Sequence, residues 1–178
     1  MSGKLYICPT PIGNLEDMTY RTIRILNEVD LIAAEDTRHS IKLLNHFEIS
    51  KPLTSYHEHN KDSKCGYLIN KLLEGENIAL ISDAGMPGIS DPGEDIIKQA
   101  IEHNIDIEVL PGATASITAL VGSGLETAKF AFEGFLDRDK KVRRNQLEEL
   151  KEERRTIIFY ESPHRLKDSL KDMLKVLG

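Results

Sequence analysis

The feature that most constrains the fold is a regular alternation of short apolar runs with helical patterns. Most of the five runs are continuously apolar, as strands covered on both faces of a sheet are. These runs cover residues 4–8, 31–35, 52–56, 78–82 and 105–110. Helical periodicity lies between them, at residues 19–27 and around residues 41–44, 68–73 and 96–101. The alternation predicts an α/β fold with a five-stranded, mainly parallel sheet.

The organisation changes after Pro111. A helix of small residues ends in glycines, and a strand at 130–135, a helix at 140–153, a strand at 156–161 and a helix at 164–174 follow. We place a domain boundary after residue 123, which gives an N-terminal α/β domain at 1–123 and a second unit at 124–178. Two strands and two helices make a thin core. The second unit is therefore predicted to be the first part of a second α/β domain.

Composition narrows the class of protein. Of the 178 residues, 40% are hydrophobic, a proportion typical of globular proteins. The net charge of −6 argues against a protein dedicated to coating nucleic acid, but it does not exclude a local basic patch. No apolar stretch approaches the roughly 18 residues of a membrane span. Cys8 and Cys65 belong to no paired motif, so we expect reduced thiols. These features predict a cytoplasmic protein with no membrane partner.

Three loops at the carboxyl ends of predicted strands are rich in proline and glycine. They read PTPIGN (9–14), SDAGMPGISDPG (82–93) and PGATAS (111–116). Glycine allows a ligand to approach the backbone closely, and proline lowers the entropy lost when the loop is ordered. Ligands of open parallel sheets bind at this edge. The loops therefore predict a nucleotide-like site made of main-chain groups, with ordinary tight turns as the alternative. Neither the P-loop pattern nor GxGxxG is present.

Polar motifs also fall at this edge. EDTRH (35–39) provides Asp36 and Arg38, where Asp36 is either a helix N-cap or a functional carboxylate. HEH (57–59) places His57 and His59 on one face of a strand, but no third ligand is evident, so we predict no metal site.

A basic segment, DRDKKVRR, covers residues 137–144. It is either a solvated helix face or a set of phosphate contacts. The residues proposed for those contacts are Arg138, Lys140, Lys141, Arg143 and Arg144.

Long stretches of the chain resemble one family. TPIGNLEDMTYRTIRILNEVDLIAAEDTRHS, SYHEHN, SDAGMPGISDPG, FEGFL and FYESPHRL are closely similar to the bacterial small-subunit ribosomal RNA methyltransferases of the tetrapyrrole-methylase-like (class III) family. The resemblance implies S-adenosylmethionine (AdoMet) as cofactor and the ribose 2′-hydroxyl of a cytidine in 16S rRNA as acceptor. Its partner would be small-subunit rRNA or the assembled small subunit. It also implies two α/β domains with AdoMet between them, and a homodimer. Members of the family are longer, so we expect the second domain to be incomplete here.

The resemblance also implies site residues. Those assigned to the cofactor are Pro9, Pro11, Gly13, Asp83, Ala84, Gly85, Met86, Ile89, Ser90, Pro111, Gly112, Thr114, Ala115, Tyr160 and Glu161. The other candidates come from the residues themselves. Arg38 and His59, together with the basic segment, are assigned to RNA. The candidates for a catalytic base are Asp36, His57 and Glu161, with Asp36 ranked first. Two alternatives stay open: a tetrapyrrole-type small-molecule methylase, and an inactive fragment that acts as a binding module.

Overall fold

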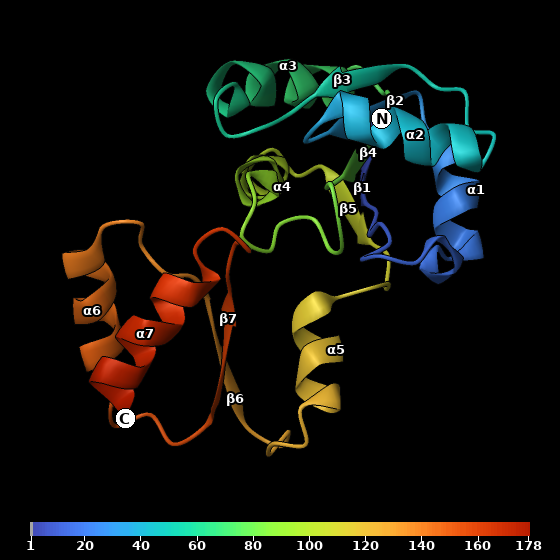
Figure 1. The fold of residues 1–178 in the computed structure, drawn as a ribbon. Coiled ribbons are helices and arrows are strands. Elements are labelled where there is room, and N and C mark those ends of the chain that lie inside the picture. Colours follow the sequence, from blue (N-terminus) through green and yellow to red (C-terminus); the bar gives the residue numbers. More distant parts are fainter. Residues whose placement is uncertain (1) are drawn as a thin grey trace. The chain divides into compact units, whose positions relative to one another are not determined.

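A single parallel sheet organises the first part of the chain. In the computed structural model, which describes residues 2–178, its strands are β1 (Lys4–Ile7), β2 (Leu31–Ala34), β3 (Leu53–Ser55), β4 (Ile78–Ile81) and β5 (Asp106–Val109). Their order in the sheet is β3-β2-β4-β1-β5, and every neighbouring pair is parallel (Figure 1). The predicted α/β class and the five predicted strands are thus confirmed.

Helices cover both faces of this sheet. The buried cluster on one face unites strand residues with α1 (Tyr20–Glu28) and α2 (Thr37–His46), and the cluster on the other face does so with α3 (Lys61–Leu73) and α4 (Gly93–Glu102). Ile78 and Leu80 point to the α3/α4 side, and Ala79 and Ile81 to the α1/α2 side. Because both faces are buried, the strand sequences are apolar at consecutive positions.

Side-chain caps mark the starts of helices α1 and α2. Thr19 caps α1 by accepting from the amide of Thr22 at 3.0 Å, and Asp36 caps α2 by accepting from that of Arg38 at 2.8 Å. A short 3₁₀ helix, η1 (Leu15–Asp17), precedes α1 and was not predicted. Caps of this kind satisfy amides that have no partner inside the helix.

The contacts divide the chain into two compact units, one ending at Thr114 and one spanning Ala115–Gly178. The second contains α5 (Ala115–Gly122), β6 (Phe130–Phe135), α6 (Lys140–Glu149), β7 (Thr156–Tyr160) and α7 (Leu166–Leu177). Strands β6 and β7 form a parallel pair, and α6 packs on α7. Helix α5 belongs with this unit through contacts with β7. The domain boundary that we place after residue 123 stays a prediction.

Within residues 2–178, no helix is long and apolar enough to cross a membrane. Cys8 and Cys65 are both buried and free.

Candidate functional site

The topology of the first unit defines a switch point between two neighbouring strands. Strands β1 and β4 are adjacent, but the helix that follows β1 covers one face of the sheet and the helix that follows β4 covers the other. In open α/β sheets, ligands bind outside the carboxyl ends of strands at such a point. The loops that leave these two strands are the first two proline/glycine loops, at residues 9–14 and 82–92.

These two loops are joined to each other by main-chain and side-chain bonds. The amides of Thr10 and Gly85 each donate to the carbonyl oxygen of the other, both at 3.0 Å. The Thr10 hydroxyl donates to the Ser82 carbonyl at 3.1 Å, and the Ser82 hydroxyl donates to the Gly85 carbonyl, also at 3.1 Å. All three residues are buried. The two loops therefore form one structure rather than two separate turns.

The third loop, after β5, packs against the same structure. A Cβ atom on Gly112 would overlap the ring of Pro9, so the close approach of these backbones requires glycine. A Cβ on Gly85 would lie 3.3 Å from the Ile12 side chain and 3.6 Å from the Ala113 carbonyl oxygen. The structure thus gathers all three proline/glycine loops at one edge of the sheet.

Most of the residues assigned to the cofactor lie in this group of loops. They are Pro9, Pro11, Gly13, Asp83, Ala84, Gly85, Met86, Ile89, Ser90, Pro111, Gly112 and Thr114. Within the long loop, Gly85 and Gly88 have φ angles of 82° and 86°, and Ser90 has a φ of 63°. The Asp91 carboxylate holds this path by accepting from the amides of Gly88 and Gly93 at 2.8 Å. A conformation that is rare for a residue such as Ser90 is typical of a loop shaped for a ligand.

Glu35, a carboxylate of the EDTRH motif that was not chosen as a site residue, lies beside these loops. Burial raises the pKa of Glu35, and the nearby charges of Asp83 and Asp91 raise it further. Asp83 in turn accepts from the backbone amide of Asp36 at 3.0 Å, which joins the loop after β2 to the loop after β4. Its position directly after a fully buried strand is the feature of the sequence that could have identified Glu35 as a site residue.

Asp36 has the capping role that was left open. Its carboxylate accepts from the Arg38 backbone amide and from the Arg38 guanidinium, at 3.1 Å to Nε and 2.7 Å to Nη2. Hydrogen bonds from the side chain and backbone of Arg38 lower the pKa of Asp36 well below its usual value. A carboxylate held in its ionised form by a cation is a weaker base.

His57 and His59 lie near each other at the end of β3, with ring centroids 6.0 Å apart. The backbone amide of His57 donates to Asn60 Oδ1 at 2.8 Å, whereas its ring Nδ1 is buried without a hydrogen-bond partner among the described residues. No group of three or more potential metal ligands gathers within residues 2–178.

The remaining cofactor candidates lie in the second unit, where Ala115 begins α5. The Tyr160 ring packs edge-on against Phe132 and Phe135, and its hydroxyl accepts from the Ser116 amide at 3.3 Å. Tyr160 thus ties β7 to the start of α5.

Glu161 is bonded on several sides. It accepts from the Ser162 amide at 2.7 Å, from the Ser169 hydroxyl at 2.5 Å and from Arg165 at 2.8 Å. Burial raises its pKa, but the bonds from Ser169 and Ser162 and the charge of Arg165 outweigh burial, so the net shift is downward. Glu161 is thereby also a weaker base than an unpartnered carboxylate.

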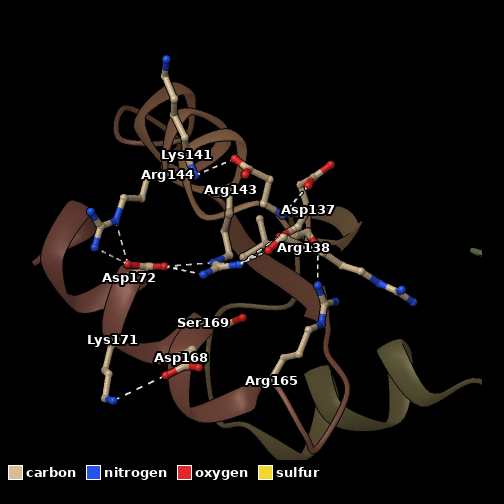
Figure 2. Close-up of polar contacts among 12 residues, drawn as sticks. Asp137, Arg138, Lys141, Arg143, Arg144, Arg165, Asp168, Ser169, Lys171 and Asp172 are labelled. Atoms are coloured by element: carbon tan, nitrogen blue, oxygen red, sulfur yellow. Dashed lines mark hydrogen bonds and ion pairs between the residues drawn. The ribbon is translucent and has the colours of Figure 1, made fainter.

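The basic segment is divided between the interior and the surface. Arg143 is buried: its Nε and Nη2 donate to Asp172 Oδ2 at 3.0 and 2.7 Å, and its Nη1 donates to the carbonyls of Asp137 and Arg138 (Figure 2). Arg144 donates to the other carboxylate oxygen of Asp172 at 2.7 Å. The guanidinium of Arg143 therefore joins α6 to α7 instead of facing solvent, as a phosphate contact would require. Arg138, Lys140 and Lys141 are exposed.

Comparisons with known proteins identify a family that matches this chain. A model of the tetrapyrrole (corrin/porphyrin) methylases matches residues 4–178. The chain is 60% identical over 176 residues to a protein of Halalkalibacterium halodurans named ribosomal RNA small subunit methyltransferase I, covering 99% of the chain and 61% of that relative. The resemblance seen in the motifs is confirmed. The chain spans 60–63% of the length of the curated relatives that it matches.

Two solved structures share the fold. A uroporphyrin-III C-methyltransferase from Thermus thermophilus has a TM-score of 0.67 at 21% identity, with 97% of this chain and 73% of that chain covered. A structure of uroporphyrin-III C-methyltransferase from the same organism, in complex with S-adenosylhomocysteine, has a TM-score of 0.65 at 17% identity, with 98% and 77% covered.

Proposed function

Because the chain belongs to the tetrapyrrole (corrin/porphyrin) methylase family, we propose that it acts in AdoMet-dependent methyl transfer to small-subunit ribosomal RNA. The acceptor in this proposal is the ribose 2′-hydroxyl of a cytidine in 16S rRNA. The name of the Halalkalibacterium halodurans relative supports an rRNA substrate. From the resemblance we also propose a homodimer, and from the composition of the chain a location in the cytoplasm.

The observation that carries the cofactor assignment is the joining of three glycine-containing loops at the switch point. A bound AdoMet would supply an electrophilic sulfonium methyl group. The loops present backbone groups at positions where Cβ atoms would interfere, as at Gly85 and Gly112, and this suits a flat polar ligand. We propose that residues 83–86, 89–90, 111–112 and 114 hold the cofactor, with Pro9, Pro11 and Gly13 bordering it. From the second unit we retain Ala115, Tyr160 and Glu161 as cofactor contacts.

The role of the protein is chiefly to align the acceptor hydroxyl, because orientation alone can lower a barrier by roughly 7–11 kcal/mol. Cationic side chains would fix the RNA backbone without reading its sequence. We propose Arg38, His59, Arg138, Lys140, Lys141 and Arg144 for this function. Arg143 is left out because its guanidinium is buried against Asp172.

Of the three candidate bases we now favour His57. Asp36 and Glu161 are both held in their ionised forms by neighbouring donors, which weakens them as bases. His57 has a buried ring nitrogen without a hydrogen-bond partner in the described part of the chain, and lies just after the carboxyl end of the edge strand β3. General bases of this kind contribute about 10²–10⁴-fold to the rate.

The test has a binding arm and a product arm. Calorimetry of the 178-residue chain with S-adenosylhomocysteine should show saturable binding. Incubation with AdoMet and small ribosomal subunits, followed by alkaline hydrolysis and mass spectrometry, should release a resistant dinucleotide that contains 2′-O-methylcytidine. A methyl group found on a base would refute the ribose assignment. Methylation of a tetrapyrrole but not of the subunits would favour the small-molecule alternative, and no binding in the first arm would refute the cofactor assignment.

A further inference from the structure

A cavity of about 350 Å³ lies within the first unit, between the loop after β1 and helix α2. This volume is within the range of about 300–1,000 Å³ that is usual for small-molecule sites. The loop and η1 contribute one wall, α2 contributes another, and Asp83 reaches it from the loop after β4. The lining residues are Thr10, Pro11, Gly13, Asn14, Leu15, His39, Lys42, Leu43, His46 and Asp83. The cavity therefore adjoins the joined loops and extends away from them along α2.

Helix α2 is unusual in its charge. The chain contains 29 Asp and Glu residues and has a net charge of −6, yet Thr37–His46 contains no carboxylate. Its polar surface carries Arg38, His39, Lys42 and His46, all of them exposed. A basic helix in an acidic protein is a local feature that the overall composition does not explain, and it complements a polyanion.

Three of these side chains line the cavity together. His39, Lys42 and His46 are spaced by three and four residues, which places them on one face of the helix. Within residues 2–178 none of them takes part in an ion pair, whereas Arg38 is paired with Asp36. This row of donors is thus suited to successive phosphates of a strand.

Three apolar residues in the lining favour a nucleotide over a simple anion. Pro11, Leu15 and Leu43 provide apolar surface, and the side chain of Leu15 remains exposed. Single-stranded RNA is recognised where unstacked bases meet aromatic, imidazole or apolar surfaces while cations contact the phosphates. The cavity offers both kinds of contact within one small space.

We propose that this cavity receives a nucleotide of single-stranded RNA beside the acceptor nucleotide, with Lys42, His39 and His46 contacting its phosphates. The inference rests on the proposed function and adds His39, Lys42 and His46 to the RNA contacts proposed there. Of helix α2, the sequence analysis had assigned only Arg38 to RNA. In this proposal, α2 binds the RNA strand next to the loops at the switch point.

The experiment measures binding of a fluorescein-labelled cytidine-rich 12-mer RNA by anisotropy, over a series of salt concentrations. The test variant is Lys42→Ala/His46→Ala. The matched control is Lys98→Ala/His103→Ala, which removes the same residue types from exposed positions within α4 and at its C-cap. A third variant, Lys42→Glu, reverses one charge at an exposed position. Thermal unfolding by circular dichroism verifies that each variant is folded.

We expect the α2 variant to bind the RNA about tenfold more weakly, because it lacks two of the side chains proposed to contact phosphates. The slope of log affinity against log salt should fall by about 0.7 for each phosphate contact that is lost. The control should stay within about twofold of the unmodified chain.

Equal affinity of the α2 variant and the control would overturn the inference. So would a polyglutamate peptide that displaces the RNA as effectively as unlabelled RNA does, because the surface would then be suited to an acidic protein. Calorimetry with S-adenosylhomocysteine is run on the same samples. If the unmodified chain does not bind S-adenosylhomocysteine, the proposed function is contradicted. If it binds S-adenosylhomocysteine but the α2 variant keeps full RNA affinity, only the inference is contradicted.

Discussion

Thr10 and Gly85 are 75 positions apart in the sequence, yet each donates its amide hydrogen to the carbonyl of the other at 3.0 Å. This pair joins the loop after β1 to the loop after β4, directly at the point where the winding of the chain reverses. The buried hydroxyl of Thr10 strengthens the joint by donating to Ser82. The stiffness of the candidate cofactor site thus depends on a contact between distant segments.

Replacing Thr10 with valine should loosen this joint. The change keeps the shape of the side chain but leaves the buried Ser82 carbonyl without this donor, which costs about 1–3 kcal/mol of unfolding free energy. Urea denaturation measures the loss, and calorimetry with S-adenosylhomocysteine should show weaker binding. Thr10→Ser retains the hydroxyl and should recover most of both quantities; equal stability of the valine variant and the unmodified chain would count against the role of this bond.

A valine at Gly85 should abolish cofactor binding. The φ of 82° is unfavourable for a β-branched residue, and a Cβ would press on Ile12 at 3.3 Å. The matched control is Gly66→Val, because a Cβ at Gly66 in α3 meets nothing within 4 Å. Calorimetry should find S-adenosylhomocysteine binding in the Gly66 variant only. Equal affinities would remove Gly85 from the site.

Truncating Arg143 should destabilise the second unit. Removing one partner of a buried ion pair typically costs about 3–5 kcal/mol, and we expect the lower part of that range because Arg144 continues to bond Asp172. Lys141→Ala, on the exposed part of the same helix, should change the unfolding free energy by less than about 0.5 kcal/mol. Chemical denaturation compares the two variants. Similar small losses in both would mean that the Arg143 contact contributes little.

Glu35→Gln should stabilise the chain, and the gain should depend on pH. The folded pKa of Glu35 is raised above its ordinary value of 4.5 by burial and by Asp83 and Asp91, so the folded state binds this proton more tightly than the unfolded state. Ionisation of Glu35 therefore disfavours folding as pH rises through 4.5 and above. Urea denaturation should show the variant to be more stable at pH 8 and equal to the unmodified chain near pH 4. A gain of the same size at both pH values would show that the effect is not due to this ionisation.

The proposed base can be tested by comparing two polar substitutions. His57→Gln should lower the single-turnover methylation rate by about 10²–10⁴-fold, as expected for loss of a general base. Asp36→Asn should keep the rate within about threefold, because asparagine also caps helices. Binding of S-adenosylhomocysteine should be unchanged in both variants. The reverse order of rates would restore Asp36 as the preferred candidate.

Much of the architecture was predictable because it depends on local chemistry. Continuous apolar runs indicated strands buried on two faces, and Asp36, one of whose two possible roles was a helix N-cap, does cap α2. Proline and glycine located the three loops, since their backbone preferences are intrinsic to the residues. The family resemblance followed from the same stretches of sequence.

By itself, then, the sequence determined which segments are strands, helices and ligand loops, whereas the tertiary structure decided which of them meet. The insertion of β4 between β1 and β2 brings Gly85 to Thr10, and the packing of α6 on α7 buries Arg143 against Asp172. The pKa of Glu35 likewise depends on Asp83 and Asp91, which belong to another loop. Periodicity and propensity describe the backbone over a few residues. Contacts between distant segments depend on how whole faces pack, and no single stretch of the chain encodes them.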